Sequence, residues 1–186
     1  MNKEFKNAIR PFLAGYQDGS LHHRLMALFL SIRDCDVVSE RGKREVWQGM
    51  TTEHGQRLLE DFVLTPKRSQ LLPCTYAFDW NTLQFKVSAF DVSRLRFPDG
   101  ADYMEVSLGV VRFDFEQLTY STEWATPLVI DRYFTSNSFS LNVATIPMGT
   151  GQLFAIVRVA FYQDVNGKPY LLPGEGAFGL QVFVEG

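Results

Sequence analysis

Hydrophobic and polar residues alternate with a period of two through most of the second half of the chain, from Tyr76 to Glu185. The alternation is clearest in three segments, residues 83–89, 104–108 and 178–184. Successive side chains of a strand point to opposite faces, so each segment predicts a strand with one apolar face. Several such strands in a row must bury these faces against one another, which predicts an antiparallel β-sandwich of seven to nine strands.

Three local features refine this prediction. The apolar residues of segment 103–116 are even-numbered in its first half and odd-numbered in its second, which predicts a β-bulge at Gly109–Arg112. Segment 153–162 is apolar at nearly every position, as is typical of a central strand covered on both faces. Asn166 and Gly167 then predict a two-residue type I′ turn between two strands of a hairpin.

The beginning of the chain follows the helical period instead. Apolar residues spaced by four, seven and eight positions from Phe5 predict a short helix that ends before residues 15–19. Ser20 is a suitable N-cap for a second helix. The apolar stripe of this second helix consists of Leu21, Leu25, Leu28, Phe29 and Ile32. Ser39 is the predicted cap of a third helical segment, in which two glycines predict a break near residues 50–52.

These patterns predict an α+β fold in three parts. Residues 1–64 form a helical head of two or three helices, residues 65–73 form a polar connector with two prolines, and residues 74–186 form the β-sandwich domain. Each helix of the head has a single apolar face, so the head must pack either on its own sandwich or on another chain.

Composition and charge narrow the class of partner. Sixteen Phe residues against three Trp and seven Tyr predict a thick core before they predict a binding face. The head carries eleven Lys and Arg against nine Asp and Glu in residues 1–70, whereas residues 71–186 carry seven against twelve. This balance, with a net charge of −3, argues against nucleic acid as the main partner.

The sequence predicts a cytoplasmic protein that does not associate with membranes. The first residues lack the apolar stretch of a signal peptide, and the most apolar run of the head, Leu25–Ile32, is too short to span a bilayer. Cys35 and Cys74 lie in different segments, and the sequence leaves open whether they are free thiols or one disulfide.

No catalytic residue, metal site or cofactor is predicted. Residues 174–179 match G-x-G-x-x-G, but a strand follows them where a dinucleotide site needs a helix. His22 and His23 would point about 100° apart on a helix, which does not suit a shared metal ion. The chain contains no G-x-S-x-G motif. The sequence therefore favours a non-enzymatic role, although it leaves the question of catalysis open.

Two groups of residues are candidates for a binding surface. The most basic run contains Arg41, Lys43 and Arg44, which could contact phosphate or an acidic protein surface. Basic residues at a helix N-terminus oppose the helix dipole, so their position there is unusual. The second group consists of aromatic residues on polar strand faces, which could stack on a sugar or contact a protein: Tyr103, Tyr120, Trp124, Tyr133 and Phe134.

A loose residue pattern in the head and the first strands resembles small uncharacterised proteins of Bacteroidetes-type bacteria. The pattern covers about half the chain and consists of Arg41-Gly42, Gly49, Gly55, Leu58-Leu59, Phe62 and Phe97-Pro98-Asp99-Gly100-Ala101. This resemblance implies no activity, cofactor or site residue.

Three functions are compatible with the sequence. The first is a binding or assembly module that recognises a protein partner or a second copy of itself, because apolar and aromatic residues are plentiful while residues with catalytic chemistry are scattered. The second is a carbohydrate-binding or hydrolytic β-sandwich, which would show exposed aromatic residues with carboxylates between them. The third is a nucleic-acid accessory protein that uses the basic residues of the head.

Overall fold

The computed structural model describes residues 1–66, 71–174 and 176–185. Within these ranges it contains four α-helices, one short 3-10 helix at Val92–Arg94, and nine β-strands. The helices are α1 (Asn2–Ile9), α2 (Leu21–Asp34), α3 (Val46–Met50) and α4 (Glu53–Glu60). The strands are β1 (Thr75–Asp79), β2 (Gln84–Ser88), β3 (Tyr103–Asp114), β4 (Thr119–Trp124), β5 (Leu128–Asp131), β6 (Phe139–Asn142), β7 (Gln152–Val165), β8 (Lys168–Leu171) and β9 (Phe178–Val184).

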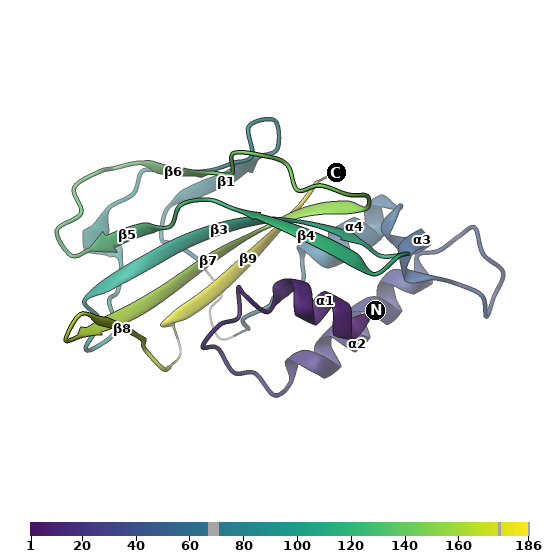
Figure 1. Cartoon of the computed structure of the whole chain (residues 1–186), viewed down its shortest axis with the longest axis horizontal. Coiled ribbons are helices and arrows are strands. Elements are labelled where there is room, and N and C mark those ends of the chain that lie inside the picture. Colours follow the sequence, from purple (N-terminus) through teal and green to yellow (C-terminus); the bar gives the residue numbers. More distant parts are fainter. Residues whose placement is uncertain (67–70, 175, 186) are drawn as a thin grey trace.

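The strands form two sheets, and all their pairings are antiparallel. One sheet has the order β1-β2-β6. In the six-stranded sheet β3 and β7 lie at the centre; β4 and β5 pair with successive parts of β3, and β8 and β9 pair with β7 (Figure 1). The predicted α+β class and the antiparallel strands are therefore confirmed.

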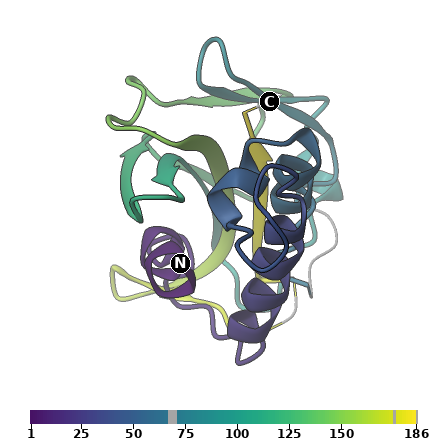
Figure 2. The ribbon, with the colours of Figure 1, turned by 90° about the vertical axis from the view of Figure 1, so that its right-hand side faces the viewer.

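The six-stranded sheet is covered on both faces. Figure 1 shows α1 and α2 below it, α3 and α4 at its right-hand end and the three-stranded sheet above it. Figure 2 looks onto this end, with the helices towards the viewer. A first buried cluster joins apolar side chains of the helices to one face of β3, β7 and β9, and a second joins the opposite face of β3 and β7 to β2 and β6. In β7 all residues from 153 to 161 are buried, which confirms the predicted central strand.

The predicted bulge in β3 is wrong. The β3–β7 ladder is continuous from Tyr103 opposite Tyr162 to Phe113 opposite Gln152. The apolar pattern changes phase because β3 contributes to both clusters: its even-numbered residues, such as Val106, face the second, and Phe113 faces the first. Two covered faces thus produce the same sequence pattern as one face with an inserted residue.

The apolar faces of the helices are as predicted from the sequence, but the number of helices is not. All five residues of the predicted α2 stripe are buried. The predicted break near residue 51 is confirmed, and it divides the third segment into α3 and α4, so that the head has four helices within the described residues. Thr52 caps α4, since its hydroxyl accepts a hydrogen bond from the Gly55 N–H at 3.0 Å. Ser39 caps no helix, because α3 begins only at Val46.

The hairpin turn between β7 and β8 is confirmed. Asn166 and Gly167 form its two-residue loop, with φ of 55° and 77°. Both central residues of a type I′ turn need positive φ, which Asn and Gly adopt at low cost. No helix within the described residues is long and apolar enough to cross a membrane.

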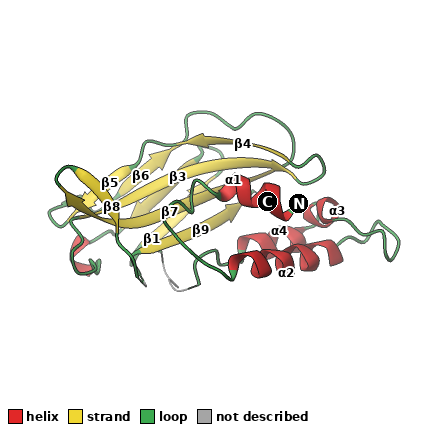
Figure 3. Cartoon of the chain, turned by 60° about the horizontal axis from the view of Figure 1, so that its bottom comes forward, coloured by secondary structure: helices red, strands yellow, loops and turns green. Residues whose placement is uncertain are grey.

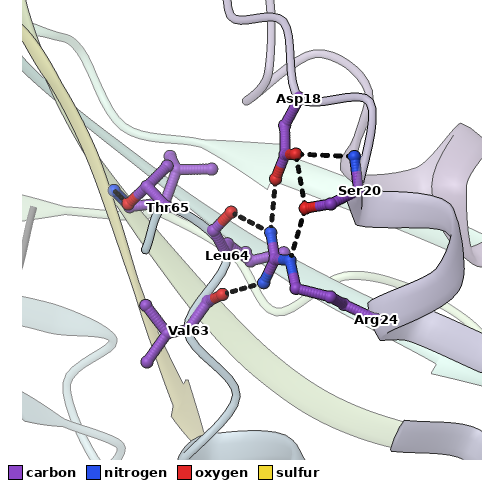
Figure 4. Close-up of polar contacts among 7 residues, drawn as sticks. Asp18, Ser20, Arg24, Val63, Leu64 and Thr65 are labelled. Atoms are coloured by element: carbon purple, nitrogen blue, oxygen red, sulfur yellow. Dashed lines mark hydrogen bonds and ion pairs between the residues drawn. The ribbon is translucent and has the colours of Figure 1, made fainter. Parts of the chain in front are cut away.

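A polar cluster fixes the head to the edge of the six-stranded sheet (Figure 4). The Arg24 guanidinium of α2 forms an ion pair with Asp18 at 2.5 Å and donates a hydrogen bond to the Leu64 carbonyl at 3.1 Å. One residue further, the Thr65 hydroxyl accepts a hydrogen bond from the Leu180 N–H of β9 at 3.0 Å. Together these contacts connect the first turn of α2, the chain after α4 and strand β9.

The ion pair of this cluster predicts a pH dependence. The hydrogen bond from the Ser20 hydroxyl, together with Arg24, lowers the pKa of Asp18 from 3.8 to about 2, although burial opposes the shift. Because the folded pKa is the lower one, Asp18 stabilises the fold above about pH 4, and this contribution is lost as the pH falls towards 2. We expect Asp18→Asn to lower the melting temperature at pH 7 and to match the native chain near pH 2. Thermal unfolding across this range tests the prediction, and a constant difference would contradict it.

Candidate functional site

The loop between α2 and α3, residues 35–45, projects beyond the helices at one end of the molecule (Figures 1 and 3). Its base is closed by the buried carboxylate of Asp36, which accepts hydrogen bonds from the N–H groups of Val38, Ser39 and Glu45 at 2.9, 2.9 and 3.0 Å. Burial would raise the pKa of Asp36, but these donors hold it well below its ordinary value. The two ends of the loop are therefore fixed to each other.

A tight turn reverses the chain within this loop. The Lys43 N–H donates a hydrogen bond to the Glu40 carbonyl at 2.9 Å, and Gly42 has a φ of +94°. This left-handed conformation favours glycine, since a residue with a side chain would adopt it only with backbone strain. The turn brings Arg41 and Arg44 near the end of α2.

Residues of α2 and of the loop line a hollow of about 500 Å³. We call it the basic hollow, and its lining consists of Arg33, Asp34, Arg41, Gly42 and Arg44. Asp34 supplies the one carboxylate of this lining, and it forms an ion pair with Arg33 at 2.8 Å. Arg44 donates a hydrogen bond to the backbone carbonyl of Asp34, at 3.3 Å. Arg41 forms no ion pair within the described ranges, so positive charge in the hollow exceeds negative charge.

The basic hollow includes two of the three basic residues that the sequence indicates. Arg41 and Arg44 line it, whereas the Lys43 ammonium group forms an ion pair with Glu40 at 2.9 Å. Arg33 was missed, although its position in the last turn of α2, directly before the loop, could have indicated it. A phosphate or carboxylate group placed in the hollow would lie among three arginines, of which Arg33 is already paired with Asp34. Guanidinium groups bind oxyanions through paired N–H donors.

The aromatic residues of the second predicted surface do not gather in one place. Tyr120 and Trp124 of β4 are 44% and 43% exposed, and Trp124 stacks on Phe12 with ring centroids 4.3 Å apart. Tyr103 stacks on Tyr162 at 5.5 Å, further along the same sheet. Because Trp124 lies opposite residue 109 of β3, five residues of that strand separate it from Tyr103.

The remaining two aromatic residues lie elsewhere. Tyr133 is 87% exposed in the turn that follows β5. Phe134 is partly buried against the second cluster, where its ring contacts those of Phe90 and Phe139 edge to face. Phe134 therefore contributes to the core more than to a binding surface.

Three carboxylates that a hydrolytic site could use serve instead as hydrogen-bond acceptors in turns. Asp79, Asp91 and Asp114 each accept hydrogen bonds from N–H groups two or three residues further along the chain. For Asp114 the Gln117 N–H and the Thr150 hydroxyl lower the pKa of the carboxyl group. A carboxylate with a lowered pKa suits a permanent hydrogen-bond acceptor and not a general acid.

The two cysteines are free thiols. Burial raises the pKa of both, and for Cys35 the neighbouring Asp34 carboxylate raises it further. The Cys35 thiol donates a hydrogen bond to the Ser31 carbonyl at 3.3 Å. A reactive cysteine needs a lowered pKa, so these environments do not favour a nucleophile.

The structure also contains a buried ion pair that was not predicted from the sequence. Arg158 of β7 is 6% exposed; it pairs with Glu105 of β3 at 3.0 Å and donates a hydrogen bond to the Tyr162 hydroxyl at 2.6 Å. Its Nε has no hydrogen-bond partner among the described residues. Arg158 is the only charged residue between 153 and 161, and this interruption of an apolar run is the signal that could have found it. Because Glu105 neutralises the charge of Arg158, this arginine is a weaker candidate for binding an anion than the basic hollow.

Comparison with known protein families, with curated proteins and with solved structures gave no significant match. The resemblance to small Bacteroidetes-type proteins therefore stays an expectation from the residue pattern.

Proposed function

We propose that the protein is a non-enzymatic binding module, and that its basic hollow holds an anionic side chain of a partner protein. The observation that supports this is the convergence of three arginines, Arg33, Arg41 and Arg44, on one hollow that contains a single carboxylate. The group bound is a phosphate or a carboxylate, because the planar guanidinium group donates two parallel hydrogen bonds to paired oxygen atoms.

Charge and exposed apolar residues favour a protein segment over a nucleic acid. Residues 71–186 carry twelve acidic residues against seven basic ones, so a long polyanion reaching beyond the hollow would meet a negative surface. Val37 and Val38 of the same loop are 83% and 75% exposed. These valines can contact apolar residues beside the anionic one, so the proposed ligand is a phosphorylated or acidic residue flanked by apolar side chains.

In the proposed module, the loop between α2 and α3 is carried by a rigid fold. We infer a β-sandwich in which the three-stranded sheet faces the six-stranded sheet across the second cluster, with the head packed on its outer face. The buried contacts of Asp36 support a loop held in place before the ligand arrives, which lowers the entropy cost of binding. The free thiols of Cys35 and Cys74 suit a reducing, cytoplasmic compartment.

Loss of the basic hollow is expected to weaken peptide binding. For the double variant Arg41→Ala/Arg44→Ala we expect the affinity for a peptide with one phosphoserine between valines to fall at least about tenfold, since each charge-assisted hydrogen bond contributes about 1.5–3 kcal/mol. Fluorescence anisotropy of a labelled peptide at low salt measures this change.

A matched control is available in the same loop. Lys43→Ala removes a positive charge that faces Glu40 instead of the hollow, and it should leave the affinity unchanged. The unphosphorylated peptide tests the need for the anion, and an aspartate peptide tests whether a carboxylate suffices. The proposal is wrong if Lys43→Ala weakens binding as much as the double variant does. It is equally wrong if single-stranded DNA of the same length binds more tightly than the phosphopeptide.

A further inference from the structure

Strand β4 forms an open edge of the six-stranded sheet. Among the residues that the structure describes it pairs only with β3, and Figure 3 shows it at the rim of the sheet, on the side of β3 away from β7. The N–H of Ala125, the residue after β4, donates to the Leu108 carbonyl at 3.0 Å. Backbone groups of an antiparallel strand alternate in direction, so those of Ser121 and Glu123 also face β3. The N–H and C=O groups of the even-numbered residues 120–124 consequently point outwards.

The other edges of this sheet are shorter, protected or covered. β5 has four residues, and β8 contains Lys168 and Pro169, which discourage pairing with another strand. On β9 the outward N–H of Leu180 is already bonded to the Thr65 hydroxyl. β4 has six residues, TYSTEW, and contains no lysine, arginine or proline. It is therefore the edge of this sheet that lacks the usual protection.

The sequence of β4 is complementary to itself. A two-fold axis through Thr122 would place Thr122 opposite Thr122, Tyr120 opposite Trp124, and Ser121 opposite Glu123. Cross-strand aromatic pairs stabilise antiparallel sheets, and both aromatic side chains are more than 40% exposed in the single chain. The only charged side chain of the strand would meet a hydroxyl group instead of a second carboxylate.

The register with its axis at Thr122 is more favourable than the two registers with the axis one residue away. Moving the axis to residue 123 would place Glu123 opposite Glu123, which is repulsive. Moving it to Ser121 would replace both Tyr120–Trp124 pairs with Tyr120–Thr122 pairs. Only the axis at Thr122 combines two aromatic pairs, three outward-facing residues on each strand and separated carboxylates.

We propose that β4 pairs in an antiparallel manner with β4 of a second copy of this chain, so that two six-stranded sheets join across a two-fold axis. The pairing is independent of the basic hollow, which lies on the loop between α2 and α3. One strand edge buries little surface, so the dimer is weak and depends on protein concentration.

Sedimentation velocity of the full chain between about 1 and about 300 µM tests the proposal, since this range brackets the affinity of a small interface. We expect the weight-average mass to rise towards twice that of the monomer. Thr122→Lys places two positive charges opposite each other at the axis and should leave a monomer throughout. The side chain of Thr122 is partly exposed, so the variant should fold, which circular dichroism verifies.

A second substitution tests the register. Ser121→Lys places lysine opposite Glu123 of the second copy, and it should lower the dimer dissociation constant at least about threefold, as cross-strand ion pairs do. A native chain that stays monomeric up to the highest concentration overturns the proposal. So does a dimer that Thr122→Lys leaves intact, because the interface would then lie elsewhere. Ser121→Lys also removes the hydrogen bond that the Ser121 hydroxyl donates to the Met148 carbonyl, so circular dichroism must first show the native fold. If the folded variant then weakens the dimer, the axis at Thr122 is wrong.

Discussion

Glu105→Leu is expected to lower the free energy of unfolding by about 3 kcal/mol, because it leaves the charge of Arg158 buried without a carboxylate. The value lies at the lower end of the range for such pairs, since the Glu105 side chain is 26% exposed. The second variant, Glu105→Leu/Arg158→Met, replaces the whole pair with apolar side chains of similar size. It should recover most of the lost stability.

Urea denaturation at pH 7 measures both changes. Glu53→Gln is a useful control, because it breaks an exposed ion pair with Arg57 on α4 and should cost less than about 1 kcal/mol. If Glu105→Leu lowers the free energy of unfolding no more than this control does, the buried charge of Arg158 does not need Glu105 for compensation. If the double variant is as unstable as the single one, the loss comes from packing and not from the uncompensated charge.

Gly49→Ala is the second substitution with a large expected effect. A Cβ atom at this position would lie 1.9 Å from the Ile32 carbonyl oxygen and 2.7 Å from its carbonyl carbon. These are backbone atoms of α2, so α2 and α3 would have to move apart. We expect a loss of about 3 kcal/mol in the free energy of unfolding, the upper part of the range for overpacked cores.

Gly19→Ala provides the matched comparison, since a Cβ atom there would meet no atom within 4 Å. Chemical denaturation of the two variants should show a large loss for residue 49 and almost none for residue 19. Because α3 begins directly after the loop that carries the basic hollow, Gly49→Ala should also weaken phosphopeptide binding. Equal stability of the two variants would show that the helices can separate at little cost.

The elements predicted correctly are those whose sequence pattern has one physical cause. The α2 stripe follows from helical periodicity, the turn at Asn166 and Gly167 from backbone preference, and the central strand of residues 153–162 from an unbroken apolar run. The bulge prediction failed because a strand that faces two different cores changes phase without an inserted residue.

The candidate site was predictable only in part. Arg41 and Arg44 are visible as a basic run, and Arg33 stands directly before the loop, but only the tertiary structure shows that the three line one hollow. The same limit applies to Gly49. From the sequence it is only a residue that destabilises a helix, whereas the structure shows that the close contact with Ile32 leaves no space for a side chain. Long-range contacts of this kind need the tertiary structure.

The position of β9 in the first cluster has a consequence for biosynthesis. The strand contributes Phe178, Leu180, Val182 and Val184 to the core beneath the helices, and its contact with Thr65 spans 115 residues of sequence. A ribosome adds about 5–20 residues per second, so the helices emerge on the order of ten seconds before the strand that completes their core. During that interval the nascent chain carries uncovered apolar helix faces, which are prone to aggregation until β9 covers them.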